Sequence, residues 1–291
     1  MGDLYLGLAI LSVLAAGLFW LGVRAGRRGS RRAAAGVGLA TTALLVLFSL
    51  TVHGKLLVAA WLPLSSAVVV GNGIPLFAAL LGGLLAGRKT VARWRRAVFV
   101  AGLLGLAWFS VLLNFTPTKL PAENRWTADG VCLQSSDASC SACAAATLLR
   151  HHGIDATEKE MISLCLTRSG GTPSLGLYRG MKLKTRGTPW DVEVVRGNFE
   201  ALFDRAGGPV VLRMWRANDA DAYPDWLERI HPAPGAGHAM VLYGPSGDGR
   251  VVMGDPAEGL CHWAVEDVKA RWRGEGLRLV RRDGKAALEA E

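Results

Sequence analysis

A candidate nucleophile and a candidate oxyanion donor lie close together: Cys140 opens an alanine-rich run, six residues after Gln134. A cysteine at the start of a helix faces unpaired backbone N–H groups and the positive end of the helix dipole, and both favour the reactive thiolate. A glutamine just upstream can donate an amide N–H to a developing oxyanion. Far downstream, His238 is a candidate base, and Asp255 follows it by 17 residues in Gly-Asp-Pro. The set predicts a Cys-His-Asp triad with Gln134 in the oxyanion hole.

Each of these residues, taken singly, has a plainer explanation. A cysteine at a helix start is often just a small buried residue, and a glutamine in a loop is often just solvated. A histidine that begins an apolar strand is often structural, and an aspartate in Gly-Asp-Pro forms turns. The ordered combination of all four is what favours catalysis.

The elements that would position these residues follow from the pattern of apolar, glycine and capping residues. The expected helices cover residues 140–152, 157–166, 172–184, 198–206 and 265–272, the second opened by a capping box at Thr157. The expected strands cover residues 191–195, 209–215, 238–243, 250–254 and 276–280. Helices followed by an antiparallel sheet predict an α+β fold. A hairpin would bring the start of the strand at His238 close to Asp255 at the end of the next strand.

The first part of the chain differs sharply in charge and hydropathy. Residues 1–116 contain eleven Lys and Arg and a single acid, Asp3, a net charge of +10, whereas the whole chain carries +9. The excess charge lies between long apolar runs, which indicates membrane topology and excludes a nucleic-acid-binding surface. We expect a transmembrane region over residues 1–116, a linker over 117–130 and a second domain over 131–291.

Four membrane spans are expected, at about residues 4–23, 33–52, 66–87 and 97–115, because each approaches the ~20 apolar residues that a bilayer requires. The apolar run at 56–87 is too long for one simple span and is interrupted at 71–75, which predicts a kink that neighbouring helices must satisfy. Two crossings of that run would each be short. The arginine-rich loops near residues 24–32 and 88–96 belong in the cytoplasm by the positive-inside rule. The chain is therefore expected to be a multi-pass protein of the bacterial inner or plasma membrane, in contact with the lipid bilayer, with its second domain periplasmic or extracellular.

All five cysteines lie in the second domain: Cys132, Cys140, Cys143, Cys165 and Cys261. Cys132 could pair with Cys165 or Cys261 in an oxidising compartment, and the sequence does not choose between them. Cys140 and Cys143 form a C-x-x-C, which we interpret as one nucleophile and one buried small residue. A zinc site would need a second pair, and the chain has none. No metal and no other cofactor is expected.

Gln134, Cys140, His238 and Asp255-Pro256, in this order and at this spacing, resemble the bacteriocin-processing cysteine peptidases, the double-glycine leader peptidases known from the N-terminal domain of bacteriocin ABC exporters. The resemblance covers roughly residues 131–280. It implies a papain-like α+β fold, a peptide or protein substrate and an exporter as a partner. The chain departs from the family pattern at Ser139 and Ser141, where the family has Asp and Gly. It also has no G-x-x-x-x-G-K-[ST] loop, so it is not an ATP-driven exporter.

Three functions follow from these observations. The first is a membrane-anchored cysteine peptidase that hydrolyses peptide bonds outside the cytoplasm, such as those of leader or secreted peptides. The second, motivated by Ser139 and Ser141, is a catalytically inactive relative that binds peptides in association with an exporter. The third, motivated by the kinked third run, is a membrane transport or assembly protein whose second domain is a scaffold.

Overall fold

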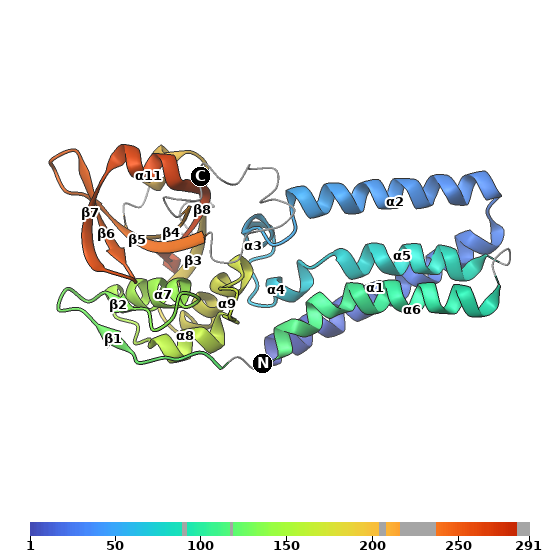
Figure 1. The fold of residues 1–291 in the computed structure, drawn as a ribbon, viewed down its shortest axis with the longest axis horizontal. Helices are drawn as coiled ribbons and strands as arrows, with labels where there is room; N and C mark the ends of the chain where they lie inside the picture. Colours follow the sequence, from blue (N-terminus) through green and yellow to red (C-terminus); the bar gives the residue numbers. More distant parts are fainter. Residues whose placement is uncertain (89–91, 117–118, 204–207, 216–236, 284–291) are drawn as a thin grey trace. The chain divides into compact units, whose positions relative to one another are not determined.

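The computed structural model describes residues 1–88, 92–116, 119–203, 208–215 and 237–283. The chain forms two compact units (Figure 1). Met1–Val58 and Ser66–Thr116 make up the helical unit, and Ala59–Ser65 and Pro117–Glu291 make up the mixed unit of helices and strands. The fold is thus mixed helix and sheet with a helical N-terminal region.

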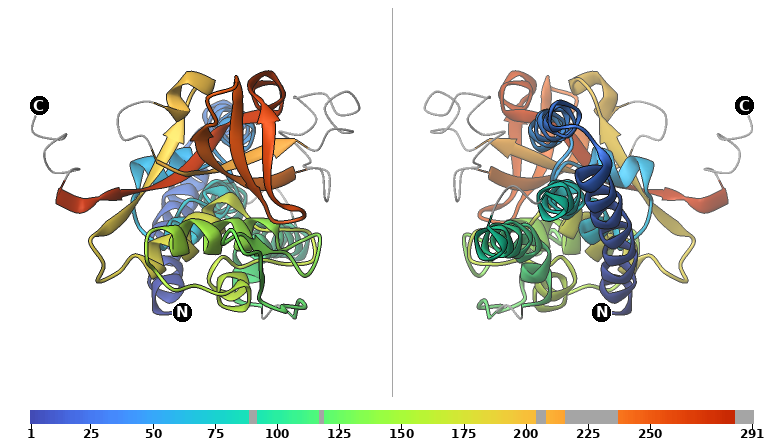
Figure 2. Two further views of the ribbon diagram at one scale, coloured as in Figure 1. Left: turned by 90° about the vertical axis from the view of Figure 1, so that its left-hand side faces the viewer. Right: turned by 90° about the vertical axis from the view of Figure 1, so that its right-hand side faces the viewer.

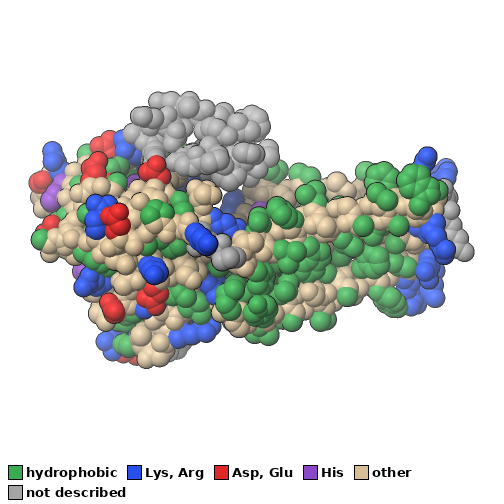
Figure 3. Space-filling model, turned by 60° about the horizontal axis from the view of Figure 1, so that its bottom comes forward, with side chains coloured by type: hydrophobic (Ala, Val, Ile, Leu, Met, Phe, Trp, Pro, Cys, Tyr) green, Lys and Arg blue, Asp and Glu red, His purple; other side chains and the backbone are tan. Residues whose placement is uncertain are grey.

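The helical unit is built from long apolar helices. Its elements are α1 (Gly2–Arg28), α2 (Arg31–Thr51), α3 (Leu57–Trp61, which runs past the end of the unit), α4 (Ala67–Val70), α5 (Ile74–Gly87), α6 (Arg93–Leu112) and the 3₁₀ turn η1 (Leu113–Phe115). In the part of the chain that is described, four stretches are long and apolar enough to cross a membrane: Gly2–Arg28, Arg31–Thr51, Ala67–Gly87 and Arg93–Phe115. Hydrophobic side chains cover this unit along its length, and Lys and Arg gather at one end (Figure 3). Helix α1 is longer than the expected span of residues 4–23. It continues to Arg28 because arginine is a good helix former.

The expected kink in the third apolar run is present as a complete break between α4 and α5. Asn72 lies in this break and is buried, and its Nδ2 donates to Ser110 Oγ on α6 at 2.8 Å. Ser110 Oγ in turn donates to the Ala107 carbonyl at 3.1 Å. A neighbouring helix therefore supplies polar partners at the interruption, as a break inside an apolar environment requires.

Helices α1 and α5 pack with their backbones in close approach because glycines face each other. A Cβ atom added to Gly22 would lie 2.5 Å from the Leu80 carbonyl oxygen, and one added to Gly87 would lie 2.5 Å from the Val23 carbonyl oxygen. Gly22 is followed by Gly26, and Gly87 is preceded by Gly83, so both helices carry glycines four residues apart. This spacing is the one that lets membrane helices approach closely.

Replacing Gly22 with alanine is expected to destabilise the helical unit by about 1–3 kcal/mol, because the new methyl group meets backbone that cannot rotate away. Gly17→Ala is the matched control on the same helix, since a Cβ at Gly17 would have no atom within 4 Å. The measurement is thermal unfolding of the full chain in detergent. Equal midpoints for the two variants would contradict the close packing of α1 on α5.

The mixed unit contains a six-stranded sheet with helices packed on both of its faces, and a separate two-stranded sheet. Its helices are α7 (Cys140–His151), α8 (Glu158–Leu164), α9 (Ser174–Lys184), the 3₁₀ turn η2 (Phe199–Leu202) and α11 (Val265–Arg271). Its strands are β1 (Arg125–Trp126), β2 (Cys132–Leu133), β3 (Trp190–Arg196), β4 (Val210–Trp215), β5 (Gly237–Pro245), β6 (Arg250–Asp255), β7 (Gly259–Ala264) and β8 (Trp272–Arg281). The larger sheet has the order β3-β8-β4-β5-β6-β7 with every neighbouring pair antiparallel. Helices α7, α8 and α9 lie on one side of it (Figures 1 and 2).

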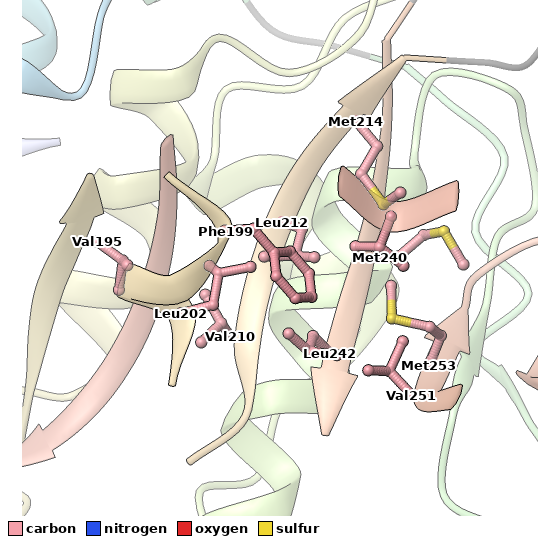
Figure 4. Close-up of a cluster of buried hydrophobic side chains, with 11 residues drawn as sticks. Val195, Phe199, Leu202, Val210, Leu212, Met214, Met240, Leu242, Val251 and Met253 are labelled. Carbon is pink, nitrogen blue, oxygen red and sulfur yellow. The ribbon is translucent and has the colours of Figure 1, made fainter. Parts of the chain in front are cut away.

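One hydrophobic core of the mixed unit lies between the sheet and the elements η2 and α11, and the opposite face of the sheet packs against α7. Figure 4 shows valine, leucine and methionine side chains from β4, β5 and β6 meeting Phe199 of η2. Removing such side chains from water is the main force that holds a sheet against its covering helices, at roughly 1.5–3 kcal/mol each. The cluster consists of Val195, Phe199, Leu202, Val210, Leu212, Met214, Met240, Leu242, Val251, Met253 and Val268.

The expected elements of the mixed unit are present with four main differences. The strand expected over 276–280 runs over Trp272–Arg281, so Trp272 belongs to it and not to the preceding helix. The helix expected over 198–206 is only the short turn η2 in its described part, and residues 204–207 lie outside the described residues. Strand β7 was not expected because its alternation is interrupted by polar residues. Part of the segment expected as a linker pairs instead with the rest of the unit, since Arg125–Trp126 of β1 is antiparallel to β2 around Gly130, which has a φ of +79°.

Candidate active site

Cys140 is the first residue of α7, as its sequence context predicts. It is buried, with 7% of its surface exposed, and Ser139 is the residue that precedes the helix. The first turn of a helix leaves backbone N–H groups unpaired, and these favour a negative charge on the sulfur. Helix α7 packs against β5, the strand that carries His238.

His238 and Asp255 meet at one end of the β5–β6 hairpin. The ring Nε2 of His238 donates to Asp255 Oδ1 at 2.7 Å, and Asp255 Oδ1 also accepts the Ala257 N–H at 2.8 Å. Both side chains are largely buried, with 11% and 9% of their surface exposed. The other ring nitrogen, Nδ1, is buried and has no hydrogen-bond partner among the described residues. With Nε2 used by Asp255, Nδ1 is the atom left to act on Cys140.

Cys140 and His238 each shift the pKa of the other. Burial alone would raise the pKa of the Cys140 thiol, but His238 and then the Ala239 N–H outweigh it and hold the pKa below its ordinary value. Burial alone would lower the pKa of His238, but the hydrogen bond to Asp255 and the nearby Cys140 raise it to about 9. Opposite shifts of this kind favour a thiolate beside an imidazolium.

Gln134 is joined to the same region through its backbone. Its N–H donates to the carbonyl of Pro256, the residue after Asp255, at 2.8 Å. Its side-chain Oε1 is buried and has no hydrogen-bond partner in the described part of the chain. The structure therefore brings all four sequence-predicted residues into one region of the mixed unit.

Glu158 is a residue of this region that the sequence pattern did not single out. It is fully buried, and its carboxylate accepts hydrogen bonds from the segment between Gln134 and Cys140. Burial would raise the pKa of Glu158, but the hydrogen bonds from Ser135 and Ser139 outweigh it and lower the pKa. The sequence indicated only a capping box at Thr157, whose hydroxyl does accept the Glu160 N–H at 3.2 Å. Nothing in the sequence signals that the intervening acid turns inward.

The five cysteines are all free thiols, and Cys132 has a different neighbour from those considered in the sequence. Cys132 and Cys143 are both fully buried, and contact with Cys132 is the largest cause that raises the pKa of Cys143 far above its ordinary value. The Cys132 N–H also donates to Thr147 Oγ1 at 2.9 Å, one helical turn beyond Cys143 on α7. Among the described residues, no group of three or more His, Cys, Asp or Glu is arranged to hold a metal ion.

No protein-family model and no curated protein matches this chain. Among solved structures, the chain is similar to the peptidase domain of Streptococcus ComA, a bi-functional ABC transporter of a quorum-sensing pathway, with 18% identity over 52% of this chain and 96% of that one and a TM-score of 0.41. It is similar to a double glycine motif protease from an AMS/PCAT transporter in complex with the leader peptide, with 18% identity, coverage of 56% and 99%, and a TM-score of 0.40. The peptidase domain of Streptococcus mutans ComA is 19% identical, with coverage of 52% and 98% and a TM-score of 0.36.

Proposed function

We propose that this protein is a membrane-anchored cysteine peptidase with a papain-like peptidase domain over residues 131–291. The observation that carries the proposal is the His238–Asp255 hydrogen bond of 2.7 Å, with the unpartnered Nδ1 of His238 next to Cys140. A buried, oriented imidazole beside a thiol at a helix start is the arrangement that nucleophilic catalysis needs.

The reaction would proceed in two halves. Nδ1 of His238 takes the proton of the Cys140 thiol while Nε2–H stays on Asp255, and the thiolate attacks a peptide carbonyl carbon. The oxyanion that forms is held by the backbone N–H of Cys140 and the side-chain amide of Gln134. The His238 imidazolium then protonates the leaving amine. Water, deprotonated by the same ring, cleaves the thioester and releases the free thiol.

The helical unit would anchor this domain in a membrane. Residues 4–116 contain no acidic residue, and ten of their eleven basic residues fall within residues 24–32 and 88–96, around the junctions of α1 with α2 and of α5 with α6. By the positive-inside rule these turns lie in the cytoplasm and the peptidase domain lies outside it. The resemblance of Gln134, Cys140, His238 and Asp255 to the bacteriocin-processing cysteine peptidases implies leader or secreted peptides as substrates, with an exporter as a partner.

The proposal is tested with an active-site-directed electrophile, a peptide aldehyde or chloromethyl ketone, applied to the full chain in detergent. Labelling at Cys140 that is lost in His238→Ala supports a working pair, because only the ion pair makes this thiol a fast nucleophile at neutral pH. Equal labelling of both proteins would overturn the triad. Labelling without hydrolysis of any peptide in a leader-peptide library would favour the inactive peptide-binding relative.

A further inference from the structure

The carboxylate of Glu158 sits at the centre of the segment that links the oxyanion-hole residue to the nucleophile. Oε1 accepts the Ser135 N–H at 2.7 Å and the Ser139 hydroxyl at 2.8 Å. Oε2 accepts the Ser135 hydroxyl at 2.5 Å and the Asn124 N–H at 3.4 Å. The residue is fully buried, and all four donors are neutral. A buried carboxylate is tolerated only when its oxygens are satisfied in this way.

Two of the residues that donate to Glu158 are direct neighbours of the two residues proposed to bind the oxyanion. Ser135 directly follows Gln134, and Ser139 directly precedes Cys140. One carboxylate therefore accepts hydrogen bonds from both ends of the five-residue segment between Gln134 and Cys140. Within the segment, Ser139 Oγ also accepts the Ser136 N–H at 3.2 Å, and the Ser139 N–H donates to the Ser136 carbonyl at 3.1 Å, which closes the segment into a tight turn. The separation of the Gln134 amide from the Cys140 N–H is thus set from a different helix, α8.

We propose that Glu158 is a positioning residue that holds the Gln134 amide and the Cys140 N–H on one oxyanion, an inference that rests on the proposed function. Glu158 does not touch the reacting atoms. It is separate from the activation of the thiol, because the groups that lower the pKa of Cys140 are His238, Ala239 and Ser141. Loss of Glu158 should therefore weaken stabilisation of the tetrahedral oxyanion while the thiolate stays reactive. A purely structural residue would change both together or neither.

Two reagents separate these properties without requiring turnover. A peptide aldehyde forms a bond between Cys140 Sγ and its carbonyl carbon, and the resulting oxygen occupies the oxyanion hole. Iodoacetamide alkylates the thiolate with loss of iodide and makes no use of the hole. In Glu158→Gln, the inhibition constant of the aldehyde should rise on the order of 100-fold, the loss typical of one oxyanion donor. The rate of alkylation at Cys140 should change by less than about threefold, since no group that acts on the thiol is removed.

The matched control is Glu160→Gln, two residues along the same helix, whose carboxylate pairs with Lys184 Nζ at 2.9 Å. It should leave both measurements unchanged. Ser139→Ala removes one bond to Glu158 without altering the buried charge, and it serves if Glu158→Gln does not fold; it should weaken aldehyde binding about tenfold, the worth of about one net hydrogen bond. Unchanged aldehyde binding in a folded Glu158→Gln or Ser139→Ala protein would overturn the proposal, as would an equal fall in alkylation. A wild-type protein that binds the aldehyde but cleaves no peptide would sink the peptidase function and leave the role of Glu158 standing.

Discussion

Peptide hydrolysis should fall by about 10⁵-fold or more when Cys140 is replaced with alanine, because no other group can form the acyl intermediate. The residue lies at the first position of α7 beside His238, and its pKa is lowered. Removing one small thiol from a helix start should leave the fold intact, since alanine is the best helix former. The assay is cleavage of a cognate leader peptide by the full chain, with circular dichroism as the check on folding.

Cys143→Ala is the control for this experiment. Cys143 lies one turn further along the same helix and is fully buried beside Cys132, so its loss removes a thiol of the same kind without touching the proposed triad. This variant should hydrolyse peptide at close to the wild-type rate. Hydrolysis that survives in Cys140→Ala, or disappears in Cys143→Ala with the fold intact, would place the nucleophile elsewhere.

Replacing Asp255 with asparagine should lower kcat roughly 10²- to 10⁴-fold. The carboxylate accepts a hydrogen bond from Nε2–H of His238, which fixes the ring and leaves Nδ1 to face the thiol. An asparagine offers no charge to stabilise the imidazolium, and its amide can turn an N–H toward the ring and favour the wrong tautomer. Asp248→Asn is the control on the same hairpin, because Asp248 is exposed in the turn between β5 and β6.

The pH profile gives this variant a second signature. The pKa of His238 is raised from 6.5 to about 9, so the interactions that hold its imidazolium are fully present below about pH 6.5 and are lost as pH rises through about 9. The thiolate–imidazolium pair, and with it kcat/KM, should therefore decline through about pH 9 in the wild type. Without the Asp255 carboxylate the pKa of His238 falls, and the alkaline limb should move to lower pH. An unmoved limb would show that Asp255 does not control the ring.

The sequence predicted the elements of the site better than the contacts between them. Cys140 opens a helix, and His238 and Asp255 lie at neighbouring ends of two strands, because alanine content, strand alternation and the Ser-Gly-Asp-Gly turn are local signals. The break before α5 was also visible, since glycine and proline interrupt the apolar run. Such patterns predict the local structure correctly because that structure depends mainly on residues that are near one another in the chain.

The burial of Glu158 and the contact between Cys132 and Cys143 could not be predicted in the same way. Both depend on how α8 and β2 pack against α7, and an acid in the first turn of a helix has the same pattern whether it faces water or a loop. The short strand β7 was missed for a related reason. Its pairing with β6, from Arg250↔Ala264 to Asp255↔Gly259, comes from the partner strand and not from its own alternation.

The two ends of the β5–β6 hairpin differ in how well they should tolerate changes in sequence and length. His238 and Asp255 lie where β5 begins and β6 ends, whereas the connecting turn, Ser246–Gly249, lies at the opposite end, about 27 Å along β5 at the usual rise per residue. Gly247 and Gly249 have φ values of +84° and +79°, and both are exposed. Residues inserted between them would lengthen the loop without shifting the strand register, at a small entropic cost. The turn is therefore a suitable site for an epitope tag or a fluorescent reporter, which would follow the mixed unit in cells without disturbing the residues proposed to be catalytic.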